Sequence, residues 1–398
     1  MFQAYRTVLT LPGSLAFSLA GFVARMPISM VGLGLVLFIS ATSGSYGLAG
    51  SVTAVSVLAS AAIAPLQSRL VDRFGQGRVV PLVLVIYTVT LSVLVVSIQL
   101  GWPTPVPHLF AAMAGASSPQ VGSFVRARWS HLLSGKPELH TAYSVEAFLD
   151  EAIFIVGPVL ATFLATGLHP AAGVVAAIVI GLVGGVLFTV QRRTEPPIPD
   201  PSAASGPKAK LGWPVLGPLM VVCAGLGSLF GSAEVVVVAF ATEQGRRPLS
   251  GTLLAIWAFG SLLAAVIVGA VKFKQSPHVR LRIGAIALAL AMLPTLFVSN
   301  LVILGIVLFV AGFAISPTLV STMSVAQATV PASRLTEGMS WTITGIAAGL
   351  AVGAGVVGRV IDAYGAQVGF AVPVVSAALA AALAFFVRRR YAETDPES

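Results

Sequence analysis

Residues 26–68 have the sequence MPISMVGLGLVLFISATSGSYGLAGSVTAVSVLASAAIAPLQS, which contains no charged side chain and decides the fold. The segment 40–47, Ser-Ala-Thr-Ser-Gly-Ser-Tyr-Gly, is its one polar break and has the small residues typical of a turn. After this break, residues 48–68 have the roughly 20 residues that an α-helix needs to cross a bilayer, and the part before the break reaches that length with the residues from 12 on. The stretch therefore predicts a hairpin of two membrane-spanning helices.

The same arrangement recurs along the chain. Residues 79–125 form an uncharged stretch with a break at 101–107, and residues 283–333 form another with a break at 294–300. Charged gaps therefore alternate with uncharged ones. We predict an all-α integral membrane protein with twelve spans, at 12–38, 46–68, 79–100, 105–126, 141–165, 170–190, 213–241, 248–271, 282–299, 301–325, 337–358 and 366–388.

The composition excludes most classes of soluble protein. Of the 398 residues, 57% are hydrophobic and 9% are charged, whereas roughly a quarter of a soluble domain is charged. The net charge of +9 would suit nucleic acid only if the basic residues formed one face of a solvated domain. They lie instead in short gaps between apolar runs, so we expect a lipid bilayer and no nucleic acid as partner.

The basic residues lie mainly on one side of the predicted membrane. Twelve spans place both termini on that side together with 19 of the 23 lysines and arginines; Arg25 lies inside a span, and Arg246, Arg247 and Arg359 lie opposite. Because basic loops are retained in the cytoplasm, we predict a multi-pass protein of a bacterial cytoplasmic membrane with both termini in the cytoplasm.

A polar segment divides the chain near its middle. Residues 191–210 include Glu195-Pro-Pro-Ile-Pro-Asp-Pro201 followed by Ser, Ala and Gly, and have too few apolar side chains to pack. The parts before and after it show a weak internal repeat, in which Ala49-Gly50 corresponds to Ser250-Gly251, Ser118-Pro119 to Ser316-Pro317 and Glu146 to Glu337. We predict two pseudo-symmetric six-helix halves, 1–190 and 212–390, with a cytoplasmic linker, 191–211, and a cytoplasmic tail, 391–398.

The segment 68–78, Ser-Arg-Leu-Val-Asp-Arg-Phe-Gly-Gln-Gly-Arg, resembles the loop signature of the major facilitator superfamily, Gly-x-x-x-Asp-Arg-x-Gly followed by basic residues. Asp72, Arg73 and Gly75 match; Ser68 replaces the first glycine, and Arg78 comes one place late. The resemblance implies the major facilitator fold and transport of a small molecule. It also implies gating roles for the matching residues and Arg78, with Asp72 facing the helix start at Glu337 as a latch between the halves. The alternative is a solvated turn whose charges only set the topology.

Gly157-Pro158 resembles the centre of a motif of proton-driven antiporters in this superfamily, although Ile153 and Ala161-Thr162 depart from it. The resemblance implies proton antiport. Gly157 also begins a row of small residues spaced four apart, and a second row comprises Gly345, Gly349 and Gly353. Such rows let helix backbones approach closely, so we expect helix packing at these glycines and Pro158.

Charged residues inside predicted spans are expensive and mark a lined cavity or a partner. Arg25 lies near the middle of span one, where a substrate anion or a protein carboxylate must neutralise it. Asp150 and Glu151 lie in the cytoplasmic half of span five, either as a structural pair with Arg126 or Arg128 or as the proton-coupling element. Arg25, Asp150 and Glu151 are candidates for substrate binding or coupling, and Arg126 and Arg128 are candidates for gating.

Three other acidic residues are candidates. Glu146 and Glu337 begin predicted helices, where they would act as N-terminal helix charges or gate pairs. Glu234 either binds a proton next to the apolar residues that follow it or turns toward the outer surface. It is a further candidate for substrate binding or coupling.

The remaining motifs exclude other chemistry. The five histidines lack the spacing of metal ligands, Cys223 is the only cysteine, and neither a nucleotide-hydrolysing loop nor a Ser-His-Asp arrangement is recognisable. We therefore expect no enzyme, no metal and no cofactor apart from the proton. The predicted function is proton-coupled efflux of a small organic molecule by a monomer that alternates its access. The alternatives are an uptake symporter or facilitator and, in a different class, a membrane receptor or intramembrane enzyme.

Overall fold

The computed structural model describes residues 2–136, 138–198, 213–270, 275–329 and 335–387, and these contain helices and connecting segments without a β-strand. The helices are α1 (Phe2–Leu9), α2 (Ser14–Arg25), α3 (Pro27–Ser43), α4 (Tyr46–Phe74), α5 (Gln76–Gln99), α6 (Pro105–Ala116), α7 (Val121–Leu132), α8 (Glu138–Gly167), α9 (Ala172–Val190), η1 (Arg192–Thr194), α10 (Trp213–Glu243), η3 (Arg247–Leu249), α11 (Ser250–Ala270), α12 (Pro277–Met292), η4 (Leu293–Phe297), α13 (Leu301–Gly312), α14 (Ile315–Thr329), α15 (Leu335–Tyr364), α16 (Ala366–Gly369) and α17 (Ala371–Ala384). This is the all-α fold that the sequence predicts.

The first helical hairpin lies where the uncharged stretch predicts it. Helix α3 ends at Ser43, and Gly44 follows with φ of +72°, a left-handed conformation that glycine adopts at little cost. Ser45 is the N-cap of α4, because its hydroxyl oxygen accepts a hydrogen bond from the amide of Leu48 at 3.0 Å. The turn is shorter than the predicted break at 40–47, since α3 continues through its first polar residues.

Eleven helical segments among the described residues are long and apolar enough to cross a membrane. In the first, α2 and α3 follow each other with a break at Met26, directly before Pro27. The predicted fourth span is the exception: α6 and α7 are separated by residues 117–120, which include Pro119. Proline lacks an amide hydrogen and disfavours the helical conformation of the residue before it, so this span is two short helices instead of one long one.

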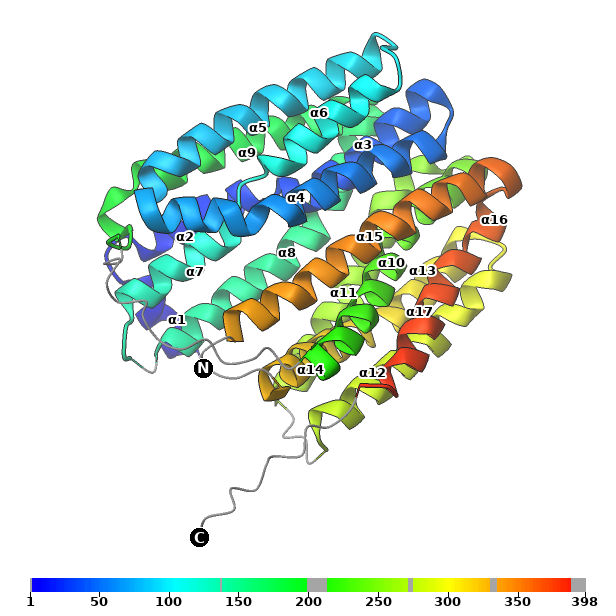
Figure 1. The fold of residues 1–398 in the computed structure, drawn as a ribbon. Coiled ribbons are helices and arrows are strands. Elements are labelled where there is room, and N and C mark those ends of the chain that lie inside the picture. The colour runs from blue at the N-terminus through cyan, green and yellow to red at the C-terminus, as the bar shows by residue number, and fades with distance from the viewer. Residues whose placement is uncertain (1, 137, 199–212, 271–274, 330–334, 388–398) are drawn as a thin grey trace.

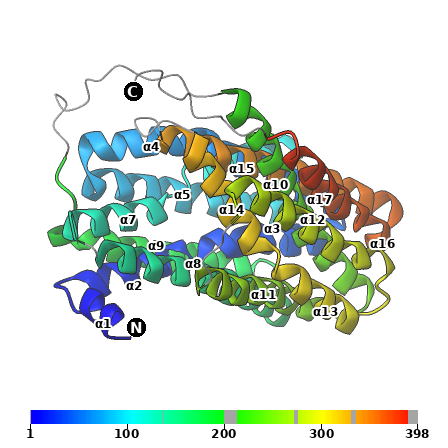
Figure 2. The same cartoon turned by 90° about the horizontal axis from the view of Figure 1, so that it is seen from below.

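Helices α2–α9 pack mainly on one another, and α10–α17 do likewise, as the blue-to-green and green-to-red groups of Figure 1 show. Two antiparallel helix pairs join the groups: α4 lies along α15, and α8 lies along α11. We call the end where α9 ends and α10 begins the linker end. The end where α3 joins α4 and α15 joins α16 is the hairpin end. Figure 2 shows the same arrangement from below.

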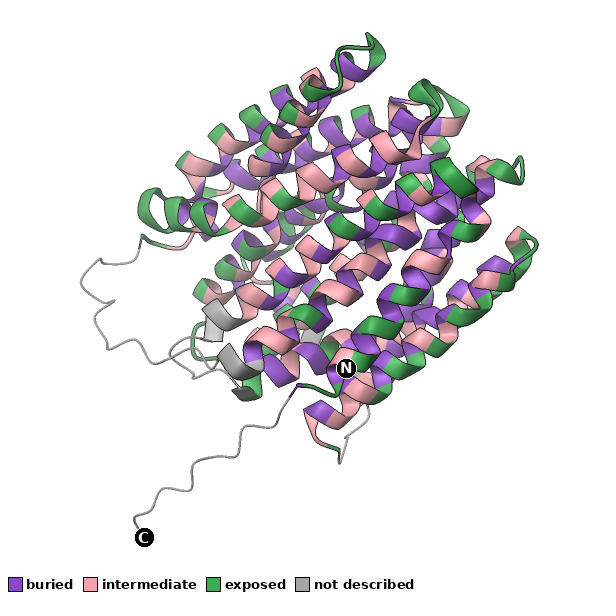
Figure 3. Ribbon diagram, turned by 45° about the vertical axis from the view of Figure 1, so that its right-hand side comes forward, coloured by how far each residue is buried: buried purple, intermediate pink, exposed green. Residues whose placement is uncertain are grey.

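The outer surface suits lipid. Large apolar side chains are strongly exposed, among them Phe163 (68%), Val302 (74%) and Phe386 (68%). Figure 3 shows exposed positions along the outward faces of long helices and buried positions between them. Exposed apolar surface of this extent is costly in water but not in hydrocarbon. The burial pattern therefore agrees with a bilayer around the bundle.

The three glycines predicted as a packing row in α15 lie against the backbone of α10. A Cβ atom at each of them would meet a main-chain carbonyl oxygen, so a larger residue would push the two helices apart. The pairs are Gly345 with Met220, Gly349 with Ala224 and Gly353 with Ser228. Gly157 of α8 approaches Ser29 of α3 equally closely, and Ser29 donates a hydrogen bond to the carbonyl of Ile153 at 2.8 Å.

Candidate functional site

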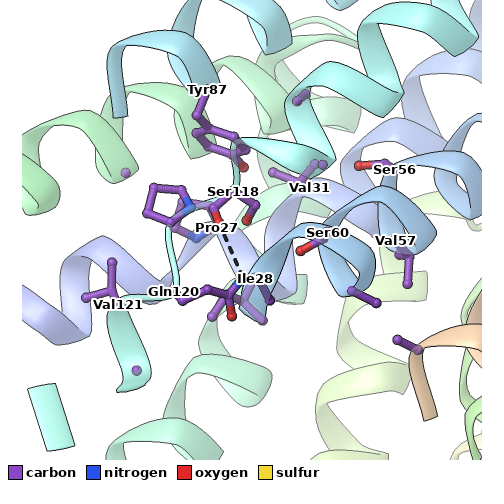
Figure 4. Close-up of a pocket in the computed structure, with 18 of the residues that line it drawn as sticks. Pro27, Ile28, Val31, Ser56, Val57, Ser60, Tyr87, Ser118, Gln120 and Val121 are labelled. Carbon is purple, nitrogen blue, oxygen red and sulfur yellow. Dashed lines mark hydrogen bonds between the residues drawn. The ribbon is translucent and has the colours of Figure 1, made fainter. Parts of the chain in front are cut away.

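A cavity of about 620 Å³ lies between the two helix groups. Most of its wall comes from α2–α9, and α10 and α15 close the opposite side. Its lining is mainly apolar with scattered hydroxyl groups, including Ser56 and Ser60 of α4, Tyr87 of α5 and Ser118 (Figure 4). An apolar cavity with few polar groups is the usual form of a small-molecule site.

Among the residues that the structure describes, two charged ones line this cavity, Arg126 of α7 and Glu234 of α10. Glu234 is half-buried and makes no hydrogen bond or ion pair within the described part of the chain. Its carboxyl group lies opposite Gly32 of α3, where an added Cβ atom would be 3.1 Å from Oε1. The carboxyl group therefore faces the space between the groups and does not turn to the outer surface, which was the predicted alternative.

The two groups are joined by hydrogen bonds at the hairpin end. The carboxylate of Asp362 in α15 accepts hydrogen bonds from the amides of Tyr46 and Gly47, each at 2.8 Å. Arg247 donates to the carbonyl of Leu37 at 2.5 Å and to the hydroxyl of Ser40 at 2.7 Å. These contacts close the hairpin end over the cavity.

The cavity extends away from these contacts, toward the linker end. Along α4 its lining runs from Thr53 to Ser68, which lies near the end of that helix. Along α7 it includes Ser123 and Arg126. The structure thus combines a joined hairpin end with a cavity directed toward the linker end.

Arg25 lies in a buried ion network next to the cavity. Its side chain is 1% exposed, and it donates to Glu146 at 2.5 Å and to Asp150 at 2.7 Å. Its Nε atom also donates to the carbonyl of Gly21 at 3.0 Å. Of the two predicted neutralising partners, the structure supplies protein carboxylates, and Arg25 does not line the cavity.

Glu146 is fully buried in this network, like Arg25. Besides Arg25, it accepts hydrogen bonds from Ser18 at 2.6 Å and from the indole of Trp129 at 2.8 Å. The prediction that Glu146 begins its helix is wrong, because α8 starts at Glu138 and Glu146 lies two turns further on. Its charge is neutralised by Arg25 instead of by a helix N-terminus.

Asp150 connects the buried network to the cavity. It accepts from Arg25 on one oxygen and from Arg126 on the other, the latter at 2.5 Å. Arg126 is 43% exposed and lines the cavity. A molecule that bound Arg126 would therefore compete directly with Asp150.

Arg128, the other arginine predicted near the end of span four, contacts no carboxylate in the network. It is buried, donates to Gln76 at 2.9 Å, to the carbonyl of Gln191 at 2.8 Å and to Thr194 at 3.0 Å. Its guanidinium lies 3.9 Å from the ring centre of Phe188. All these partners belong to the first helix group, so Arg128 ties that group together and does not face the second.

A family model described as Major Facilitator Superfamily matches residues 17–331 of this chain. The chain belongs to the major facilitator superfamily. This match confirms the predicted family and the predicted fold. It also confirms that the protein is a secondary transporter and not an enzyme.

Solved structures of other transporters have the same fold. The nucleoside transporter NupG is 14% identical, with a TM-score of 0.74 over 94% of this chain and 98% of its own. A bacterial homologue of the human lysosomal transporter Spinster, in an inward-facing and occupied conformation, is 14% identical, with a TM-score of 0.69 over 96% and 97%. The peptide transporter POT is 12% identical, with a TM-score of 0.73 over 94% and 93%. No curated protein sequence matches this transporter.

Glu151 of the transporter faces away from the ion network. It shares one side of α8 with Pro158 and Thr162, and both of these residues contact Gly251 of α11. Glu151 is half-buried, makes no hydrogen bond or ion pair among the described residues, and does not line the central cavity. It therefore lies on the side of α8 that faces the second helix group.

The predicted latch loop lies at the linker end of the transporter. Asp72, Arg73 and Arg78 are exposed, and Arg73 lies over the ring of Phe74 at 5.2 Å. Gly75 has φ of +83° and ends α4. Glu337 belongs to α15, but its side chain is outside the described part, so the contact between Asp72 and this helix stays a prediction.

The functional candidates that the sequence did not predict are Asp362, Ser18, Trp129 and the hydroxyl groups of the cavity. Ser18 lies seven residues, or about two helical turns, before Arg25, so both fall on one face of span one. That spacing was a usable signal. No comparable signal pointed to Trp129, which reaches Glu146 only because α7 packs on α8.

Proposed function

We propose that this transporter exports a small organic molecule from a bacterial cytoplasm in exchange for protons, by alternating access. The observation that carries the proposal is Glu234, a cavity-lining carboxyl group without a described partner. In a cavity that opens in turn to two compartments, such a group meets water, substrate and apolar walls in succession. Each change of surroundings alters its affinity for a proton.

We propose an organic cation with an apolar body, such as a protonated amine, as the substrate class. A carboxylate among apolar and hydroxyl groups is stabilised by a cation that brings its own neutralising charge. The apolar wall suits the rest of such a molecule. Because proton and cation neutralise the same carboxylate, binding of one releases the other, which is the requirement for antiport.

Asp150 is the second coupling candidate, and Glu151 the third. Asp150 does not line the cavity, but its partner Arg126 does, so substrate binding acts on it indirectly. Glu151 has no described partner and lies on the side of α8 that faces α11. Substrate occupancy and movement between the halves would therefore change their surroundings less directly than those of Glu234.

The direction of transport rests on the antiporter-like Gly157-Pro158 pair and on the basic residues that place the linker end in the cytoplasm. With that orientation, the cavity extends toward the cytoplasm. We further propose a monomer with the halves 1–190 and 212–390. The nucleoside and peptide transporters that share the fold are only 12–14% identical, so an uptake symporter or a facilitator is the alternative.

The test is transport into inverted membrane vesicles with an imposed proton gradient. We expect accumulation of ethidium, an apolar cation, and loss of this accumulation when an uncoupler collapses the gradient. Glu234→Gln should abolish gradient-driven accumulation and also weaken exchange of the dye without a gradient, because the amide can neither carry the proton nor neutralise the cation. The losses of gradient-driven accumulation in Asp150→Asn and Glu151→Gln, measured in the same assay, rank the other two coupling candidates.

Glu243→Gln is the matched control, since Glu243 lies in the same helix but outside the cavity lining. It should accumulate the dye normally. Accumulation that survives collapse of the gradient would favour a facilitator. Normal gradient-driven accumulation by Glu234→Gln would disprove its coupling role, and transport of neutral molecules alone would disprove the substrate class.

A further inference from the structure

The ends of α4 and α15 carry the same sequence pattern. Residues 68–75 are Ser-Arg-Leu-Val-Asp-Arg-Phe-Gly, and residues 358–365 are Gly-Arg-Val-Ile-Asp-Ala-Tyr-Gly. Arginine, aspartate and the final glycine are identical, two aliphatic residues precede each aspartate, and an aromatic residue precedes each glycine. The loop signature at Asp72 thus has a second copy at Asp362.

The two copies also share their backbone structure. Gly75 has φ of +83° and ψ of 156°, and Gly365 has φ of +84° and ψ of 170°. Each helix ends at its aromatic residue, and a new helix begins after the glycine. A glutamate then accepts an amide hydrogen at the start of that helix: Glu195 from Gly77 at 2.8 Å, and Glu243 from Ala366 at 2.7 Å. The repeated sequence is therefore a repeated structural unit.

The two units lie at opposite ends of the molecule. Helices α4 and α15 pack side by side (Figure 1) and run in opposite directions, so each helix ends where the other begins. Asp362 lies at the hairpin end, next to the start of α4. Asp72 lies at the linker end, where α15 starts at Leu335.

Asp362 binds the N-terminus of α4 across the boundary between the helix groups. Its carboxylate accepts from the hydroxyl of Ser45 and from the amides of Tyr46 and Gly47, each at 2.8 Å. The first amides of a helix have no partner inside the helix and carry partial positive charge. The contact therefore satisfies these donors and holds the two groups together.

Glycine makes this approach possible on both sides. A Cβ atom at Gly358 would overlap the carbonyl of Tyr46, and one at Gly50 would overlap the carbonyl of Ala354. The first position of the pattern is thus a glycine in the copy whose helix is docked. In the other copy it is Ser68, which lines the cavity at the linker end.

We infer that Asp362 is a gate residue, whose binding to the N-terminus of α4 holds this transporter closed at the hairpin end. Asp72 is its counterpart for the opposite state, in which the linker end closes on the start of α15. The two latches alternate, because rocking of the halves that closes one end opens the other. The inference rests on the alternating access of the proposed function, but not on its substrate, its coupling ion or its direction.

The test measures the rate at which a maleimide labels single cysteines in detergent, where both ends are accessible. Ala354→Cys reports on the hairpin end, since Ala354 is 1% exposed and lies against Gly50. Ser123→Cys reports on the linker end, since Ser123 is exposed and lines the cavity. The native Cys223 is buried, and protein without an added cysteine gives the background.

Asp362→Ala should raise the labelling rate at position 354 and lower it at position 123, each by roughly two- to tenfold. Asp362→Asn keeps an acceptor oxygen but loses the charge, so its shift should have the same sign and a smaller size. Adding Asp72→Ala to Asp362→Ala should return both rates toward those of the original protein, because both latches are then absent.

Glu243→Ala is the matched control, because it removes a helix cap at the same end but within one group. It should leave both rates unchanged. The inference is overturned if Asp362→Ala keeps both rates, or if the rate rises at position 354 without falling at position 123, which indicates local fraying of α4. The labelling experiment contains no substrate and no gradient, so its result does not depend on the outcome of the transport assay. Conversely, unchanged labelling would not contradict the proposed coupling role of Glu234.

Discussion

Arg25 is the central cation of the ion network, because it neutralises both Glu146 and Asp150. Arg25→Ala leaves Glu146 buried without its cation, so we expect a loss of about 3–5 kcal/mol in unfolding free energy. Arg25→Lys keeps the charge but not the planar fork that reaches two carboxylates. Its unfolding free energy should therefore lie between those of the original protein and Arg25→Ala. Thermal unfolding in detergent, followed by tryptophan fluorescence, measures both changes.

Arg193→Ala provides the matched control at this scale. Arg193 is exposed, so removal of its charge should leave the melting temperature unchanged. An Arg25→Ala protein with an unchanged melting temperature and full transport would show that Arg25 supports neither the fold nor the active conformation.

At the scale of a helix, the glycine row of α15 sets the distance to α10. A Cβ atom at Gly349 would overlap the carbonyl of Ala224, whereas one at Gly355 meets no atom within 4 Å. Gly349→Ala should therefore cost about 1–3 kcal/mol of unfolding free energy through displaced packing. Gly355→Ala should be neutral or slightly stabilising, since alanine favours a helix more than glycine does.

Melting temperatures of the two variants in the same detergent test this difference. The comparison is internal, because both substitutions add one methyl group to one helix. Equal melting temperatures would show that α15 can shift away from α10 at no cost, contrary to the close packing of the two backbones.

At the scale of the whole molecule, the proposed halves should associate without a covalent linker. Each helix group packs mainly within itself, and the groups also contact each other along α4 with α15 and α8 with α11. Glu195 and Thr194 belong structurally to the first group, through Gly77 and Arg128. The chain should therefore be divided after Ile198. We expect residues 1–198 and 199–398, expressed together, to copurify and transport substrate.

Division between Gln67 and Ser68 is the control, because it cuts α4 inside the helix. That pair of fragments should neither copurify in quantity nor transport. If the division after Ile198 fails in the same way, the chain is one cooperative unit and the proposed halves are not independent.

The amino-acid sequence by itself determined that this chain is an all-α membrane transporter, and it indicated most of the spans. Helix length and apolar character are local properties, and lipid imposes them on every spanning segment. The break in the fourth span was not predicted, because the free-energy cost of a proline such as Pro119 inside a helix depends on the residues packed around it.

Only the tertiary structure decided which charges meet. Arg25 and Asp150 are 125 positions apart, and their contact depends on how α2 packs on α8. Asp362 and Tyr46 are 316 positions apart, and they meet because α15 and α4 run antiparallel. Glu234 lies on the cavity wall because of how α10 is rotated about its axis. The sequence of α10 is apolar on nearly all sides, so it does not indicate which side faces the cavity. Side-chain partners in a bundle are set by helix rotation and tilt, and the sequence of a single helix contains neither.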